Sequence, residues 1–405
     1  MMLILSILLT YPHFLSYKVH INFQNSFMGG IFMNKILMTP GPTNVPEEVF
    51  AAMSQNMHHR TDEFLKVMYD ADKKLRKVFG TQNEVVMLLS SGTGGLEASV
   101  VNIFSPGDDL LVINCGVFGR RYADISREYG VNVDEIKTEW GQGIGPEILN
   151  DYLDKKKYKA VYATYSETST GIKNDIKKLG SIVKNHGALF IVDAVSAIGS
   201  LKFDADKYNV DLAIAGSQKG LMCPPGLSLL ALSDRAWDAV LSSKMPRFYF
   251  DLRKYKNSSI PYTPGVSLIL GLNKALDMLL KKGLDNVYHD ADIYSRAVKS
   301  ACNILGLSEF PDKRYCSEVL TALWVPSGVD DKLLRSQMQE NGVVIAGGQG
   351  RLKGKIIRIG HIGYLKCDYI LKTIYSLGSA LNKQGYKSDV KGALGEAETV
   401  LGAIK

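Results

Sequence analysis

The sequence lacks the cysteine patterns that mark metal-binding and disulfide-rich proteins. Its 405 residues contain five cysteines, and no two of them form a C-x-x-C pair. Isolated cysteines argue against a zinc site and a disulfide framework, and they fit a reducing compartment. We therefore expect no bound metal and a cytoplasmic location. The cysteines are Cys115, Cys223, Cys302, Cys316 and Cys367.

The N-terminal apolar run is also too short to cross a bilayer. It extends from Met1 to Thr10, no basic residue precedes it, and no clear small-residue cleavage site follows. We expect residues 1–33 to be an extension outside the fold, with the folded chain beginning near Met28 or Met33. No membrane association is expected.

Strong charge of one sign is missing as well. Lys and Arg number 48 against 41 Asp and Glu, a net charge of +7 that is mild for this length. The basic residues are scattered apart from the short run 155–157, so nucleic acid is not an expected partner. The 46% hydrophobic and 22% charged residues are typical of a soluble globular protein. A chain of this length usually forms two domains.

Short apolar runs alternate with helical spacings over most of the chain, which predicts an α/β fold. A mostly parallel seven-stranded sheet with helices on both faces follows from this alternation. We expect a large domain over 34–285 and a smaller C-terminal α+β domain over 286–383, with 34–50 packing near the smaller one and 384–405 as a tail. The expected strands are 84–89, 109–114, 131–137, 160–164, 188–193, 211–215 and 227–231.

A lysine and an aspartate end two of these runs. Lys219 follows the small apolar residues 213–216, and Asp193 closes the run 188–193. A surface lysine in a loop is one interpretation, because lysine is rarely buried. The other is that both side chains face one ligand. Pyridoxal phosphate (PLP) needs this pair, since Lys219 would form a Schiff base and Asp193 would keep the pyridine nitrogen protonated.

The turn 90–95, Ser-Ser-Gly-Thr-Gly-Gly, lies between an expected strand and an expected helix. This layout binds phosphate through free backbone N–H groups and the positive end of the helix, although a plain glycine turn reads equally well. Ligands of such sheets lie beyond the carboxyl ends of the strands. Five candidate residues lie at or shortly beyond such ends: Ser91, Phe118, Thr168, Asp193 and Lys219.

Together these segments resemble the class V aminotransferases of the fold-type I PLP enzymes, and within them the alanine–glyoxylate and serine–pyruvate aminotransferase branch. The resemblance runs from about Ile36 to about Leu381. It is carried by Thr-Pro-Gly-Pro-Thr at 39–43, Ser-Gly-Thr at 91–93, Gly-Val-Phe-Gly at 116–119, Glu-Thr-Ser-Thr-Gly at 167–171, Val-Asp-Ala-Val at 192–195, Gly-Ser-Gln-Lys at 216–219 with Pro-Pro-Gly at 224–226, and Arg-Ile-Gly at 358–360.

The resemblance implies roles for single residues. Arg358 would clamp the substrate carboxylate, and Gly41 would lie in the substrate site. Thr263 would reach the cofactor phosphate from the partner subunit of a homodimer, whereas its alternative role is to cap the helix that begins near Pro264. The implied cofactor-binding residues of one subunit are Ser91, Gly92, Thr93 and Gln218 at the phosphate, and Phe118, Thr168, Asp193, Val195 and Lys219 around the ring.

Two positions depart from the family pattern. Phe118 stands where the animal members often have tryptophan, so ring stacking is kept and the indole N–H is lost. Ile260 stands where a tyrosine sometimes reaches the phosphate, and Tyr262 is near but out of register.

The implied activity is a ping-pong transamination from alanine or serine to glyoxylate or pyruvate, and aspartate or a ureide donor remains open. A cysteine desulfurase is one rival, but Gln218 replaces the histidine expected before the lysine, and neither Cys316 nor Cys367 has the context of a mobile loop. A phosphonate-amine aminotransferase and an inactive binding protein of this fold are the others.

Overall fold

A computed structural model describes residues 35–404 of the chain. The expected extension at 1–33 lies outside the described residues. Within the described part, no helix combines the length and the apolar character needed to span a bilayer.

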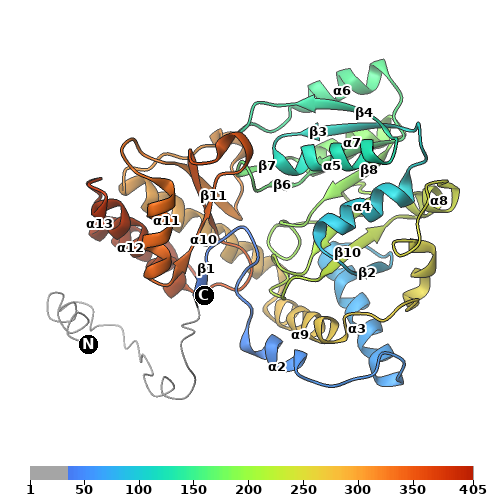
Figure 1. Cartoon of the computed structure of the whole chain (residues 1–405), viewed down its shortest axis with the longest axis horizontal. Helices are drawn as coiled ribbons and strands as arrows, with labels where there is room; N and C mark the ends of the chain where they lie inside the picture. The colour runs from blue at the N-terminus through green and yellow to red at the C-terminus, as the bar shows by residue number, and fades with distance from the viewer. Residues whose placement is uncertain (1–34, 405) are drawn as a thin grey trace. The chain divides into compact units, whose positions relative to one another are not determined.

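The largest sheet of the described chain has seven strands in the order β2-β10-β9-β8-β5-β3-β4 (Figure 1). Only β10 runs antiparallel to its neighbours, and the other pairs in the sheet are parallel. This confirms the predicted mostly parallel sheet. Its strands are β2 (Val85–Leu89), β3 (Asp109–Asn114), β4 (Asn132–Lys137), β5 (Ala160–Thr164), β8 (Leu189–Asp193), β9 (Leu212–Gly216) and β10 (Leu227–Leu232).

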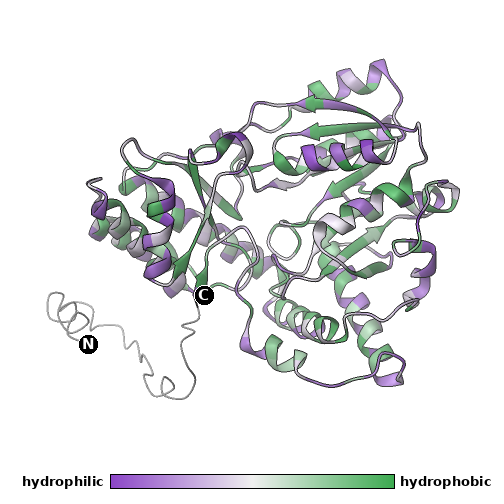
Figure 2. Cartoon of the chain, viewed as in Figure 1, coloured by the Kyte–Doolittle hydropathy of each residue, from purple (hydrophilic) through white to green (hydrophobic). Residues whose placement is uncertain are grey.

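Helices cover both faces of this sheet, so its central strands are largely apolar and do not alternate between polar and apolar residues. Every residue of β5, β8, β9 and β10 is buried. One core cluster lies between the sheet and α3 (Asp62–Phe79), α6 (Pro146–Lys155), α7 (Ile176–Asn185) and α9 (Val266–Lys282). The other lies under α4 (Gly92–Ile103), α5 (Val117–Glu128) and α8 (Asp234–Ser242). In Figure 2 the strands are mainly hydrophobic, and the helices that cover them carry both hydrophobic and hydrophilic residues.

Local signals account for the limits of these helices. In α3, the Thr61 hydroxyl accepts a hydrogen bond from the Phe64 N–H at the start, and Gly80 ends the helix in the left-handed conformation at φ 62°. A hydroxyl N-cap and a glycine C-cap are the usual terminators. In α4 the N-cap is Ser91, whose side chain accepts from Gly94 N–H.

The C-terminal part contains a three-stranded antiparallel sheet in the order β11-β14-β13. Near it, β1 (Ile36–Leu37) pairs in parallel with β12 (Val343–Val344), and Met38 joins the core of this part. The remaining strands are β6 (Ser166–Glu167), β7 (Ile172–Lys173), β11 (Leu320–Trp324), β13 (Ala346–Gly347) and β14 (Ile356–Gly360). The remaining helices are α2 (Glu47–Met53), α10 (Leu284–Ile304), α11 (Asp331–Glu340), α12 (Cys367–Lys383) and α13 (Val390–Leu401), with short 3₁₀ turns η3 (Leu252–Lys254), η4 (Lys256–Ser258), η5 (Lys313–Tyr315) and η6 (Gly350–Leu352).

The sequence suggested a weakly patterned tail over 384–405, but the described part of it, residues 384–404, is folded. It contains α13, which packs against α10 and α12. Asp389 caps this helix by accepting from Gly392 N–H at 2.8 Å. Ala393, Ala397 and Leu401 are buried at a spacing of one helical turn. Two of these three residues are alanines, so the apolar stripe is weak in the sequence although it is well packed.

Candidate active site

Several loops meet at the carboxyl edge of the large sheet. Asp193 is the last residue of β8, and Lys219 follows β9, the neighbouring strand in which Ile214 pairs with Asp193. A pocket of about 400 Å³ opens here, and Lys219, Phe118, Thr168 and Arg358 are among the residues that line it. The structure thus brings together side chains that are far apart in the sequence.

The Lys219 side chain is 9% exposed, and its Nζ donates a hydrogen bond to the Pro40 carbonyl. Its pKa is lowered to about 8, chiefly by burial; the Asp193 charge opposes this lowering, and the Arg358 and Arg121 charges add to it. Gly41 lies against this amine, since a Cβ added at Gly41 would be 2.5 Å from Nζ. The backbone of Gly41 also has φ +126°, which side-chain-bearing residues rarely adopt.

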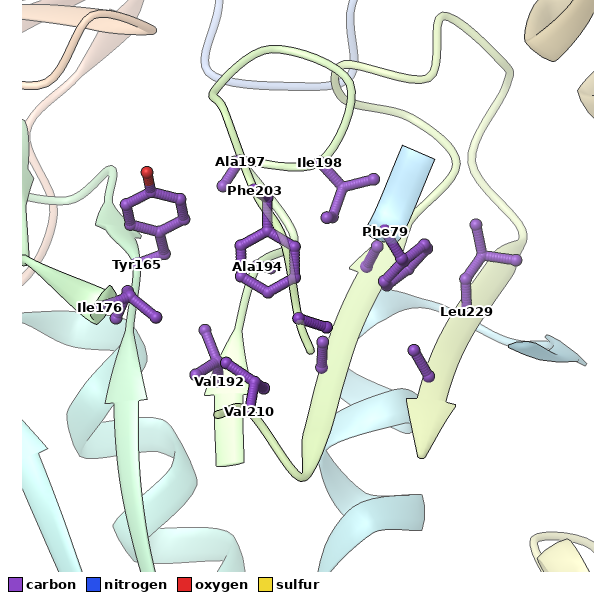
Figure 3. Packing of buried hydrophobic residues seen from close by; sticks show 14 of the residues in the cluster. Phe79, Tyr165, Ile176, Val192, Ala194, Ala197, Ile198, Phe203, Val210 and Leu229 are labelled. Carbon is purple, nitrogen blue, oxygen red and sulfur yellow. The ribbon is translucent and has the colours of Figure 1, made fainter. Parts of the chain in front are cut away.

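Asp193 is buried and held at both oxygens. Its Oδ1 accepts from the Val195 N–H at 2.9 Å, and its Oδ2 accepts from the Tyr162 hydroxyl at 3.2 Å. Burial raises the pKa of Asp193, and these hydrogen bonds and the Lys219 charge act in the opposite direction. The residues that follow Asp193 pack into the apolar core, where Figure 3 shows Ala194, Ala197 and Ile198 beside Phe203. The hydrogen bonds and the packed backbone after Asp193 therefore fix the position of its carboxylate.

Tyr162 was not singled out in the sequence. It lies in β5, its ring stacks on Tyr122 of α5 at 3.8 Å, and the Tyr122 hydroxyl lies 3.0 Å from the Ser99 hydroxyl of α4. All three side chains are buried. The signal was a tyrosine within the apolar run 160–164, because a buried tyrosine hydroxyl requires a partner.

The first turn of α4 has the properties of an anion site. Its N–H groups at Gly92 and Thr93 have no acceptor within the helix, and the helix dipole is positive there. Gly92 packs closely on Val195, since an added Cβ would lie 3.2 Å from that side chain. Arg121 donates to the Thr93 hydroxyl at 3.1 Å and lies 4.8 Å from the Phe118 ring centre. The Gln218 Oε1 is buried and lacks a hydrogen-bond partner among residues 35–404.

Phe118 is positioned by a buried glutamate that sequence reasoning missed. Glu167 Oε2 accepts from the N–H groups of Phe118 at 3.0 Å and Gly119 at 3.2 Å. Its Oε1 accepts from both the N–H and the hydroxyl of Ser169. Burial raises the pKa of Glu167, and these hydrogen bonds lower it. The carboxylate serves as the N-terminal cap of α5, whose own N-cap residue, Gly116, has no side chain.

Arg358 is 5% exposed and has no carboxylate within ion-pair distance in the described part of the chain. Its Nε donates to the Gly347 carbonyl at 2.8 Å, and its Nη1 donates to the Thr168 carbonyl at 2.7 Å. Burial lowers its pKa to about 10, against the nearby Glu167 charge. A buried guanidinium with donors left over and no counter-ion is suited to an anionic ligand.

Not every candidate residue lines this pocket. Gly41, Phe118, Thr168, Lys219 and Arg358 do, whereas the following candidates are not among its lining residues: Ser91, Gly92, Thr93, Asp193, Val195, Gln218 and Thr263. Thr263 is exposed, and no contact within the described residues places it with the other candidates. Its alternative role as a helix cap is wrong, because α9 begins at Val266 with Gly265 as its N-cap and with no side-chain cap.

A lysine and an aspartate on adjacent strand ends, beside a helix N-terminus, define the site of an enzyme that uses PLP. Residues 37–353 match the protein-family model for class-V aminotransferases, so the chain belongs to that family, as the sequence predicted. PLP is the cofactor of the family, and the buried amine, the free first turn of α4 and the glycine contacts at Gly41 and Gly92 fit it. Within residues 35–404, no three His, Cys, Asp or Glu side chains are grouped to hold a metal.

Named relatives differ in their stated activities. The chain is 38% identical to the soluble hydrogenase 42 kDa subunit of Anabaena cylindrica, over 88% of this chain and 96% of that one. It is 37% identical to an L-aspartate–glyoxylate aminotransferase of Paracoccus denitrificans, over 81% and 86%. It is 35% identical to a serine–glyoxylate aminotransferase of Methylorubrum extorquens, over 87% and 92%.

A solved structure has the same fold over nearly the whole chain. This is the pyridoxamine–pyruvate aminotransferase of Mesorhizobium loti, with a TM-score of 0.88 and 30% identity over 92% of this chain and 98% of that one. The family and the predicted fold are therefore confirmed together.

Proposed function

We propose that this protein transfers the amino group of alanine or serine to glyoxylate or pyruvate by a ping-pong mechanism. The observation that carries the proposal is Arg358, a buried guanidinium without a counter-ion, in the same pocket as Lys219. Such an arginine suits substrates with an α-carboxylate. The serine–glyoxylate and pyridoxamine–pyruvate relatives support this choice of donor and acceptor.

In this proposal, Asp193 would pair with the ring nitrogen of PLP, and Thr168 would hydrogen-bond its phenolic oxygen. Phe118 and Val195 would pack against the ring. Ser91, Gly92, Thr93 and Gln218 hold the phosphate. Lys219 binds the cofactor, and Arg358 with Gly41 binds the substrate. When bound, PLP supplies an electron sink for the charge left at the substrate's α-carbon.

Lys219 moves the proton in this scheme. Because its pKa is lowered to about 8, about a tenth of the amine is neutral at pH 7 and can accept a proton at Nζ. Arg358 keeps the α-carbon near that amine by holding the carboxylate. The Tyr162 and Val195 hydrogen bonds orient Asp193 and favour its ionised form, against the effect of its burial.

We further propose that the active unit is a homodimer in the cytoplasm. Phe248 is 73% exposed and Leu89 is 41% exposed, and both lie near the segment that carries Thr263. Tyr262 packs on Phe248, and Gly265 lies against Leu89. An exposed apolar surface beside the phosphate loop suits a second subunit.

The proposed cytoplasmic location is supported by the five free cysteines, which suit a reducing compartment. We also propose that the boundary between a large and a small domain lies near residue 285, close to the start of α10.

The alternatives have weaker support. A desulfurase needs a reactive thiolate, whereas burial raises the pKa of Cys316 to about 11. A phosphonate amine would leave Arg358 without a carboxylate to bind. An aspartate donor remains the closest rival, in view of the relative from Paracoccus denitrificans.

A panel of amino donors and oxo-acid acceptors tests the proposal. We expect alanine or serine with glyoxylate or pyruvate to give the highest kcat/KM, and Lys219→Ala, the control, to give no turnover. Sulfide release from cysteine would point to a desulfurase. Comparable turnover of amines without a carboxylate would remove the assigned role of Arg358, and a preference for aspartate would replace the proposed donor.

A further inference from the structure

Gln349 lines the pocket that contains Lys219 and Arg358, and none of the assignments above uses it. It lies between β13 and β14, where its carbonyl accepts from the Leu352 N–H at 3.0 Å. Its neighbours are pinned as well. Gly348 N–H donates to Ile356 at 2.9 Å, and an added Cβ at Gly350 would lie 2.9 Å from the Trp140 ring. The backbone on both sides therefore holds this side chain at the pocket.

The Gln349 carboxamide is not satisfied by the protein. Its Oε1 is buried and has no hydrogen-bond partner among the residues that the structure describes. The oxygen and nitrogen ends of an amide are interchangeable by a half-turn, so the group can present either an acceptor or two donors to a ligand. A buried polar group without a partner costs stability, which indicates that a ligand supplies the partner.

The other polar groups of the pocket are already committed. The Thr39 hydroxyl donates to the Pro42 carbonyl at 2.7 Å. Arg358 uses two of its five N–H groups on carbonyls, which leaves three for the substrate carboxylate. Thr168 and Lys219 are assigned to the cofactor. Gln349 is thus the neutral polar side chain that remains for the rest of the substrate.

We propose that Gln349 is a specificity-determining residue that hydrogen-bonds the side chain of the amino donor, so that the enzyme prefers a hydroxylated donor such as serine to alanine. This inference rests on the proposed transamination. Alanine would leave the carboxamide unpaired, whereas a hydroxyl can both donate to it and accept from it. One such hydrogen bond corresponds to a preference on the order of 10-fold.

Binding and turnover can be measured separately in the holoenzyme. α-Methyl-L-serine and 2-methylalanine bind like the two donors but have no α-proton to lose, and their binding is followed by the visible absorbance of the cofactor. We expect the wild type to bind the hydroxylated compound on the order of 10-fold more tightly. The serine-to-alanine ratio of kcat/KM with glyoxylate should favour serine by a similar factor.

Gln349→Met keeps the length of the side chain and removes its hydrogen-bonding groups. Both ratios should fall to about one in this variant, and a normal cofactor spectrum and melting temperature show that it is folded; Gln349→Leu replaces it if it is not. Unchanged ratios would overturn the assignment. Equal weakening of both compounds would also overturn it, because Gln349 would then bind the common carboxylate. A wild-type enzyme that transfers no amino group from either donor would instead refute the proposed function.

Discussion

Lys219 shows how the pocket sets the chemistry of a single residue. Its amine is surrounded by the positive charges of Arg358 and Arg121 and by the negative charge of Asp193, and burial is the largest cause of its lowered pKa. A lysine at the surface would stay protonated at neutral pH, with a pKa of about 10.4. The site therefore prepares a nucleophilic amine before any substrate is bound.

The rate of PLP capture by the apoprotein should rise with pH and level off above about 8, because only the neutral amine attacks the aldehyde. Stopped-flow absorbance across pH 6–11 measures this, with Nα-acetyl-lysine as the reference for changes in the cofactor itself. Arg358→Met should move the midpoint upward, since a positive charge that lowers the pKa is removed. A midpoint near that of the free amine, unchanged in the variant, would contradict the assigned environment.

Asp193 and Arg358 are held differently although both are buried charges. The aspartate receives a backbone N–H and a tyrosine hydroxyl, so its ionised form is stabilised. The arginine is oriented by hydrogen bonds to two carbonyl groups, and its other N–H groups remain available to a ligand. These supports pre-orient both charges for cofactor and substrate.

At the scale of elements, the N-terminal turns of α4 and α5 carry the groups around the cofactor site. Helix α4 is capped by its own Ser91, whereas α5 is capped from a distance by Glu167 of β6. The second arrangement fixes Phe118 relative to the strand edge. A change at Glu167 should therefore affect both folding and the cofactor site.

Glu167→Gln should lower the free energy of unfolding by about 1–3 kcal/mol. Both carboxylate oxygens accept hydrogen bonds, and in the variant the amide NH₂ would face donors and leave them without an acceptor. It should also weaken PLP binding, since Phe118 loses its support. Denaturant titration of the apoprotein and spectroscopic PLP titration measure the two effects. Glu147→Gln, in the exposed first turn of α6, is the matched control and should change neither. Wild-type stability in Glu167→Gln would show that the cap contributes nothing.

At the scale of the whole molecule, the position of Thr263 bears on assembly. It lies outside the pocket of its own chain, in an exposed segment beside Tyr262 and Phe248. If it completes the phosphate site of a second subunit, cofactor binding and dimerisation are linked, and PLP should tighten the dimer.

A mixing experiment tests this link. Thr263→Ala should weaken PLP binding on the order of 10-fold in its homodimer, through the loss of one hydrogen bond to a charged group. Mixed with Lys219→Ala subunits that retain Thr263, the Thr263→Ala subunits should regain high affinity at their intact lysine. Lys219→Ala alone, which should bind no cofactor covalently, is the control. A fully active monomer in sedimentation at assay concentration would exclude the shared site.

The sequence by itself determined the seven-stranded α/β fold and the edge at which the pocket lies. Buried strands appear as continuous apolar runs, and the polar residues that end them must gather at one edge when the strands are parallel. For this reason Lys219, Asp193 and Ser91 could be proposed from position alone. The departure at Phe118 was equally visible, because it needed only a comparison with the family pattern.

Only the tertiary structure decided which distant groups support that pocket. Glu167 caps a helix that begins 50 positions earlier in the chain, Tyr162 reaches Asp193 across neighbouring strands, and Gln349 arrives from the C-terminal part. None of these contacts follows a period or a motif, since each depends on the three-dimensional register of separate elements. The helix at 390–401 escaped detection for a related reason, because its small apolar residues have a weak pattern and are buried only by the helices packed around them.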